Sequence, residues 1–168
     1  GDEFQLKGNL WVRAIKTLHP VPSLGYVFFR RVHKLKPEFS SLPGPEIALR
    51  RKRGDDIFHE HLQYEFAYAT DTLPEVLDRN PELFEVDTLV LECTFLDEKK
   101  TVADARAGCH IHLDELLPMM PKMQNKNVIL MHFSQLYTPA EVQRVFNERC
   151  PPEYRSRFQL FIPNGEQW

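Results

Sequence analysis

Imidazole and carboxylate side chains recur in this sequence where strand-like segments end. Loops that follow strands are where α/β proteins hold metals and ligands, so residues at these points can meet at one edge of a sheet. Four of them follow or close strand-like segments: His19 after residues 10–18, Asp71 after 64–70, Glu92 within 86–95 and His132 after 127–131. His110 opens a helical segment. The pattern predicts that these side chains converge on one site.

Imidazole nitrogen and carboxylate oxygen together suit zinc, and one carboxylate is able to bridge two ions. Zinc lowers the pKa of bound water and so supplies a nucleophile for a phosphodiester, and two ions would clamp the attacking and leaving oxygens. A glutamate–histidine pair beside them, here Glu92 and His110, would deliver a proton to the leaving group. The residue types therefore point to metal-assisted hydrolysis.

Each of these residues also has a structural explanation. His132 could be a core histidine with its hydrogen bonds satisfied, Asp71 could cap a turn, and His19 could lie in a surface turn. His112 competes for the place beside Glu92, or it could cap the helix. Glu92 is the hardest to explain structurally, because burial of an unpaired carboxylate is costly.

The chain has the pattern of an opening hairpin followed by strands and helices in alternation. Residues 10–18 alternate apolar and polar side chains, and residues 26–32 form a second strand-like run after a break with two prolines and a glycine. Thr138 and Pro139 are typical of a helix N-cap and first turn. The alternation that follows the hairpin predicts an α/β fold. The expected strands are 10–18, 26–32, 64–70, 86–95, 127–131 and 157–162, and the expected helices are 43–56, 100–108, 112–123 (interrupted by prolines) and 138–150.

Size and composition bound the class of protein. The 168 residues are enough for one domain with its own core, and the composition is that of an ordinary globular protein. No run of about 18 apolar residues is present, which argues against a membrane span, and the first residues do not resemble a targeting peptide. Three widely spaced cysteines favour an intracellular, reducing compartment over a disulfide framework. The net charge of −3 neither supports nor excludes a nucleic-acid partner, because a local basic patch is enough to bind one. The basic run 50–53 is the candidate for such a patch.

Several short segments occur in a recognisable order along the chain. They are TLHPVPSLGYVF around His19, AYATDT around Asp71, LVLECTFLDE around Glu92, GCHIHLDE around His110 and VILMHFSQLY around His132. A further segment at 43–56, PGPEIALRRKRGDD, resembles a Pro-Pro-Gly stretch leading to Leu-Lys-Arg-Gly. In order and rough spacing the whole set resembles ribonuclease Z, the tRNA 3′-processing endonuclease of the metallo-β-lactamase superfamily. The resemblance spans nearly the whole chain.

The motifs differ in detail from those of the family. Where the family has Gly-Asp-Thr, with an aspartate that bridges two zinc ions, residues 70–72 are Thr-Asp-Thr. Its His-Glu-Ala-Thr corresponds to Leu-Glu-Cys-Thr at 91–94, its His-Ser-Thr to His-Ile-His at 110–112, and its Thr-His-Phe-Ser to Met-His-Phe-Ser at 131–134. The family's His-x-His-x-Asp-His motif, which supplies three ligands and the general base, is absent. The His-Glu-His at 59–61 does not replace it, because no Asp-His follows.

The resemblance implies an αββα metallo-β-lactamase-like sandwich, a mixed sheet with flanking helices. Residues 1–168 would be the C-terminal part of a single domain that lacks its N-terminal half. It also implies that His19, Asp71 and His132 are metal ligands in a two-zinc centre and that Glu92 and His110 form the catalytic proton relay. The expected function is that of a zinc-dependent phosphodiesterase acting on precursor tRNA. The expected partners are the missing half or a second chain, with a homodimer as one possibility and no membrane.

Two other functions stay open at this level. One is a small-molecule metallo-hydrolase of the same fold that acts on a non-RNA ester. The other is a metal-free binding or scaffolding module whose strand residues serve packing alone. Measuring the metal content distinguishes the metal-free module from the two hydrolases. Comparing the activity on precursor tRNA with the activity on a generic phosphodiester distinguishes the two hydrolases from each other.

Overall fold

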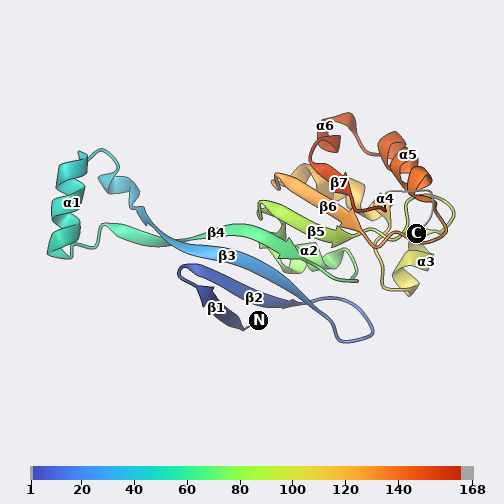
Figure 1. Ribbon diagram of the computed structural model, residues 1–168, viewed down its shortest axis with the longest axis horizontal. Helices are drawn as coiled ribbons and strands as arrows, with labels where there is room; N and C mark the ends of the chain where they lie inside the picture. Colours follow the sequence, from blue (N-terminus) through green and yellow to red (C-terminus); the bar gives the residue numbers. More distant parts are fainter. Residues whose placement is uncertain (1, 164–168) are drawn as a thin grey trace.

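Seven strands form one mixed sheet in the computed structural model, which describes residues 2–163, and their spatial order follows their order in the chain (Figure 1). The first four strands are antiparallel to one another, and the last four are parallel. The strands are β1 (Glu3–Lys7), β2 (Leu10–Lys16), β3 (Leu24–Leu35), β4 (Phe58–Tyr68), β5 (Thr88–Glu92), β6 (Asn127–Met131) and β7 (Phe158–Leu160). The predicted mixed sheet with flanking helices is therefore confirmed.

Helices connect the parallel strands, as a parallel sheet requires. The longest of these connecting helices is α5 (Pro139–Arg149), and Thr138 caps it as predicted. The helix expected at 112–123 is split, because prolines interrupt it, into α4 (Leu113–Leu116) and the 3-10 turn η3 (Leu117–Lys122). The other elements are α2 (Glu75–Arg79), η2 (Pro81–Phe84), α3 (Val102–Ala107) and α6 (Pro152–Arg155). No helix among residues 2–163 is long and apolar enough to cross a membrane.

Strands β3 and β4 extend beyond the rest of the sheet as a two-stranded arm (Figure 1). Their pairing continues to Leu35 and Phe58, and helix α1 (Gly44–Arg53) and the turn η1 (Pro37–Phe39) lie at the far end. The strands expected at 26–32 and 64–70 were therefore too short. The outer part of the arm consists mostly of charged and polar residues, and its few apolar residues, such as Val32 and Leu62, do not alternate regularly enough to mark a strand.

One face of the sheet carries the core. A row of paired residues across five strands is buried: Val27, Ala67, Leu89, Val128 and Phe158. Buried apolar side chains of α2, α4 and α5 belong to the same cluster, so these helices cover this face. Burial of this apolar area is the main stabilising contribution to the fold.

The opposite face of the sheet is open and apolar, and we call it the open face. Its members alternate with the buried row, since neighbouring residues in a strand point to opposite faces. None of them is fully buried, and the side chain of Tyr26 is 41% exposed. Two paired rows form this face: Phe4, Val12, Phe28 and Phe66 in one, and Tyr26, Tyr68, Val90 and Ile129 in the other.

Candidate metal site

The loops that follow β2, β4, β5 and β6 bring all five predicted site residues to one edge of the sheet. Asp71 Oδ2 lies 3.6 Å from His132 Nε2. The rings of His110 and His132 are stacked with centroids 5.1 Å apart, and the ring of His19 lies 6.0 Å from that of His110. Strands β4, β5 and β6 are parallel neighbours, so their carboxyl ends must share this edge. The convergence expected from the strand-end pattern is present.

Glu92 is fully buried at the end of β5, and its carboxylate accepts five hydrogen bonds. Oε1 accepts from the backbone N–H of Thr72 and from Nδ1 of His110, both at 3.0 Å. Oε2 accepts from the backbone N–H groups of Thr94 and Ile111 at 3.2 and 3.1 Å and from the Thr94 hydroxyl at 2.7 Å. These partners offset the cost of burying the charge.

The hydrogen bonds of Glu92 exclude it as a metal ligand. One ligand atom each from Glu92, His110 and His132 lie within 4.8 Å of one another, so proximity alone would make the three a metal-binding group. A carboxylate, however, offers about four lone-pair sites, and the five donors occupy them. Glu92 is therefore suited to orient the residues around it, while the imidazoles and Asp71 retain atoms for a metal.

His110 is held by Glu92 in a defined orientation. Because the carboxylate only accepts, Nδ1 of His110 carries the proton of their hydrogen bond, and Nε2 is left for a metal or a substrate. The hydrogen bond that His110 donates to Glu92, followed by the charges of Glu92 and Asp71, raises the pKa of His110 against the opposing effect of burial. A raised pKa favours the protonated form that a general acid needs. A carboxylate–imidazole pair is also the usual support of a metal-bound histidine, so the proton-relay role of His110 stays a prediction.

Two residues at the site have left-handed backbone conformations that are uncommon for side chains other than glycine. His132 has φ of 62°, and Cys109, which precedes His110, has φ of 60°. Non-glycine residues in this region cost free energy and cluster at functional sites. At His132 the chain turns sharply out of β6, and Ser134 N–H then donates to the carbonyl of Thr94 at 2.9 Å. The turn therefore places the segment after His132 beside the loop that follows β5.

The loop that carries His19 is tied to the loop that carries Asp71. The backbone N–H of Leu18 donates to Thr72 Oγ1 at 2.9 Å, and Leu73 N–H donates back to the carbonyl of Leu18 at 3.2 Å. His19 and Asp71 line a common hollow of about 420 Å³. Gly25 keeps β3 close to β4 here, because a Cβ atom would lie 2.7 Å from the Tyr68 carbonyl oxygen. The ligand role of His19 stays a prediction.

His112 and Cys93 take structural roles. His112 is buried and caps α4, with Nδ1 accepting from Asp114 N–H at 3.1 Å and Nε2 donating to the carbonyls of Asp97 and Lys100. It therefore does not compete for the place beside Glu92. Burial raises the pKa of the Cys93 thiol well above its ordinary value, so this cysteine stays protonated and packs in the core.

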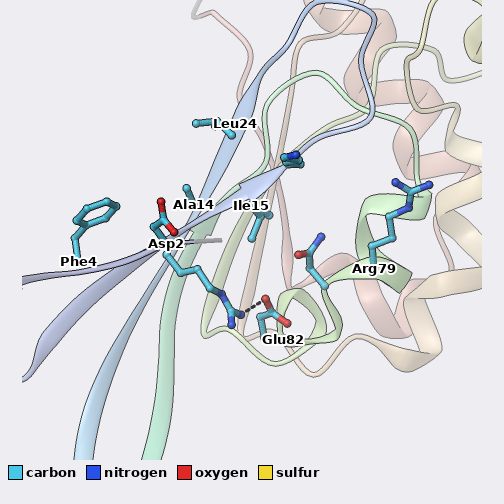
Figure 2. A pocket seen from close by; sticks show the side chains of 10 residues that line it. Asp2, Phe4, Ala14, Ile15, Leu24, Arg79 and Glu82 are labelled. Atoms are coloured by element: carbon cyan, nitrogen blue, oxygen red, sulfur yellow. Dashed lines mark hydrogen bonds and ion pairs between the residues drawn. The ribbon is translucent and has the colours of Figure 1, made fainter.

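A second hollow, of about 780 Å³, lies away from this edge, between the start of the chain and α2 (Figure 2). It contains none of the predicted site residues. The guanidinium of Arg13 at its wall already pairs with Glu82, and Phe4 and Leu24 line the opposite side. Its size therefore does not make it a competitor for the candidate metal site.

Sequence patterns missed the groups that surround Glu92. The backbone donors of Thr72, Thr94 and Ile111 carry no residue-type signal, because any residue other than proline has an N–H. The Thr94 side chain had a usable signal, since a threonine two residues beyond a buried acidic residue is placed to donate to it. The strand-end pattern therefore identified the ionisable residues of the site but not the hydrogen bonds that orient them.

No protein-family model matches the sequence. Among curated proteins, it is 35% identical over 154 residues to tRNase Z TRZ1 of Arabidopsis thaliana and 33% identical over 145 residues to the chloroplastic tRNase Z TRZ2 of the same plant. These matches cover 90% and 85% of this chain but 55% and 41% of the relatives. The chain therefore spans about half the length of the curated relatives it matches.

Solved structures agree on the fold. The metallo-β-lactamase fold protein YhfI of Bacillus subtilis aligns with a TM-score of 0.54 over 93% of this chain and 48% of its own, at 13% identity. The short form of human tRNase Z aligns with a TM-score of 0.50 over 98% of this chain and 43% of its own, at 16% identity. The fold of the chain is therefore that of the metallo-β-lactamase fold proteins. In sequence, the chain is similar to the curated tRNases Z, in line with the resemblance that its motifs indicated.

Proposed function

We propose that this chain is the C-terminal half of a zinc-dependent endoribonuclease that processes the 3′ end of precursor tRNA. The observation that carries the proposal is the opposition of Asp71 and His132, 3.6 Å apart, beside the Glu92–His110 pair. A carboxylate and an imidazole that face each other beside a second histidine held by a buried carboxylate have the chemistry of a hydrolytic metal centre. Relatives at 35% and 33% identity are tRNases Z, which favours RNA over a small-molecule ester as substrate.

The donor set at this edge fits zinc. Asp71 and His132, with His19 beside them, would hold the metal, which when bound supplies a nucleophile at neutral pH and neutralises charge on the phosphate. Glu92 holds the His110 imidazole through Nδ1, which leaves Nε2 to carry the proton for the departing ribose 3′ oxygen. Because Glu92 is buried and makes no contact with solvent, its role is to fix and charge this histidine.

The site needs further ligands from outside residues 2–163. Two zinc ions want about four donors each, and three side chains cannot satisfy both. The open face adjoins the site, since Glu92 pairs with Met131 in the row next to Val90 and Ile129. We propose that an N-terminal half covers this face and supplies the missing donors at its edge.

Reconstitution tests the function. The chain, combined with the remaining half of its protein and zinc, should cleave precursor tRNA at its 3′ end and bind zinc tightly. Asp71→Ala should abolish both, while Asp78→Ala, an exposed acidic residue on α2, should change neither. Cleavage of bis-p-nitrophenyl phosphate without cleavage of precursor tRNA would favour a small-molecule hydrolase. A reconstituted protein without bound metal would leave only a binding or scaffolding module.

A further inference from the structure

The side chain of Thr94 lies between the buried carboxylate and the second histidine of the site. Its hydroxyl oxygen is 2.7 Å from Glu92 Oε2 and 3.0 Å from His132 Nδ1. Thr94 is 5% exposed and Glu92 is fully buried, so the contact between them is shielded from water, while His132 is 41% exposed at the edge of the sheet. Glu92, Thr94 and His132 thus form a continuous hydrogen-bonded chain from the core to the edge of the sheet.

The direction of each hydrogen bond in this chain follows from the number of protons available. The Glu92 carboxylate accepts from three backbone N–H groups, so it is the acceptor toward Thr94 as well. The threonine hydroxyl has one proton, which it donates to Glu92. The contact with His132 must therefore be Nδ1–H donating to the hydroxyl oxygen. The neutral His132 imidazole is consequently protonated on Nδ1 and carries its lone pair on Nε2.

That lone pair faces another acceptor. Nε2 of His132 lies 3.6 Å from Asp71 Oδ2, so an unprotonated nitrogen and a carboxylate oxygen are opposed. Two acceptors at this distance repel each other unless a cation or a proton is shared between them. In water, neutral imidazole prefers the other tautomer, with its proton on Nε2. Without an acceptor at Nδ1, the ring would therefore present an N–H to Asp71, and Nε2 would have no lone pair for a metal held between the two residues.

We infer that Thr94 is a positioning residue that fixes the metal-binding tautomer of His132 by passing on the orientation set by Glu92. The inference deepens the proposed function, on which the metal role of His132 rests. One buried carboxylate then orients both imidazoles, His110 by direct contact and His132 through a hydroxyl. Partners of this kind hold metal-bound histidines in one tautomer, and their loss costs about 10–100-fold in metal affinity.

A purely structural role for Thr94 makes a different prediction. The backbone N–H of Thr94 already donates to Glu92 at 3.2 Å, so the residue could serve only to satisfy the buried charge. In that case, loss of the hydroxyl would lower stability and leave the imidazole of His132 unchanged. Substitutions that keep or remove the hydroxyl at nearly constant volume separate the two roles.

The decisive measurement is the tautomer of His132 by long-range ¹H–¹⁵N NMR of the chain, without metal, at a pH where its imidazole is neutral. His132→Asn identifies the resonance. The wild type and Thr94→Ser should show the proton on Nδ1, and Thr94→Val should shift it toward Nε2. Thr88→Val at the start of β5, where the hydroxyl has only a 3.5 Å contact with Asn127, is the control and should behave as wild type.

The wild-type spectrum alone can overturn the inference, even if Thr94→Val does not fold. A proton on Nε2 of wild-type His132, or the same tautomer in folded Thr94→Val, would show that Thr94 does not set it. A zinc titration adds a second readout: Thr94→Val should weaken binding by about 10–100-fold and Thr94→Ser should restore it. Because the tautomer is read without metal or RNA, absence of ribonuclease activity would refute the proposed function and leave this inference standing.

Discussion

At the scale of single residues, the site is organised around Glu92, which is fully buried and whose oxygens are occupied by hydrogen bonds. Its oxygens hold His110 directly and Thr94 through the hydroxyl, while Asp71 stands 37% exposed opposite His132. The atoms proposed to bind metal therefore lie at the exposed edge of the sheet, and the carboxylate that orients the imidazoles lies in the core. Substitutions at the exposed positions and at the buried positions should therefore differ in their effects on turnover, metal binding and stability.

His110→Ala in the assembled enzyme should lower the turnover rate by roughly 10²–10⁴-fold, the usual contribution of a general acid. Metal content should stay the same, because the ligands proposed here are other residues. The loss should be smaller for a substrate with a nitrophenolate leaving group, which departs without a proton. Comparison of the two substrates, with metal analysis of each preparation, checks this. Equal losses on both, or loss of zinc, would make His110 a ligand or a structural residue.

The His110–Glu92 hydrogen bond should also make stability depend on pH. It raises the pKa of His110, so protonated His110 stabilises the folded state fully below the unfolded-state value of about 6.5, and this contribution is lost as pH rises through the folded-state pKa. Urea unfolding of the metal-free chain between about pH 5.5 and 8 should show this fall, and His110→Gln should remove it. His33→Gln, an exposed histidine on the arm, is the control. An identical pH slope in wild type and His110→Gln would contradict the prediction.

At the scale of elements, the loop after β6 leads into α5 through a reciprocal cap. Glu141 N–H donates to Thr138 Oγ1 at 3.3 Å, and Glu141 Oε2 accepts from Thr138 N–H at 2.8 Å. Hydrogen bonds from the Thr138 backbone, Lys99 and the Thr138 hydroxyl lower the pKa of Glu141 to about 2. The stabilisation from this carboxylate is therefore present above its ordinary pKa and lost as pH falls toward 2.

Thr138→Ala should lower the free energy of unfolding by ~1 kcal/mol at neutral pH, because it leaves an N–H at the helix start without its acceptor. Chemical denaturation of the metal-free chain measures this, with Gln143→Ala on the exposed face of α5 as control. A loss in Thr138→Ala no larger than that in the control would mean that the cap contributes nothing to stability.

The elements that could be predicted from sequence are those whose pattern has a local cause. The strand at 127–131 and the cap at Thr138 were predicted correctly, because an apolar run and a threonine–proline pair act over a few residues. The turns in 74–84 and the helix α6 were missed, since they are short and held by tertiary packing. β1 was missed as well, because four of its five residues are exposed.

The candidate site, too, could be predicted from sequence only where the pattern has a local cause. Strand ends located Glu92 and His132, because parallel strands must bring them to one edge. The hydrogen bonds that decide what each residue does join segments far apart in the chain, such as Thr72 with Glu92. Such contacts depend on the three-dimensional path of the chain, which no local pattern encodes.

At the scale of the whole molecule, the open face should be an interface with the rest of the protein. The chain alone should bind zinc weakly and be inactive, because three ligands do not complete two sites. Zinc titration and a phosphodiesterase assay of the chain, with and without the remaining half, check this. Tight stoichiometric zinc and activity in the chain alone would contradict it.

The arm presents a basic surface far from the site. Three consecutive cations at the end of α1, Arg51, Lys52 and Arg53, are exposed, whereas Arg50 is paired with Glu46. Replacing the three by alanine should weaken tRNA binding and lower the dependence of log affinity on log salt by about 0.7–0.9 for each RNA phosphate that these side chains neutralise in the wild type. Cleavage of a small phosphodiester by the assembled enzyme should be unchanged.

A control for the arm variant removes exposed cations from another part of the chain. Lys100→Ala with Lys122→Ala takes two exposed cations from outside the arm, one just before α3 and one at the end of η3. This double variant should keep the wild-type affinity and salt dependence. If it weakened tRNA binding as much as the arm variant, the effect would come from net charge and not from the arm.

The burial of Glu92 also bears on the order in which the chain folds. Its five hydrogen-bond donors belong to the segments around Thr72, Thr94 and Ile111, which meet only when β4, β5 and the loop before α4 are all in place. A partly folded chain that enclosed the carboxylate earlier would hold an unpaired charge in an apolar interior, at a cost of several kcal/mol. We therefore expect such intermediates to be disfavoured and the segments that surround Glu92 to fold together in one cooperative step.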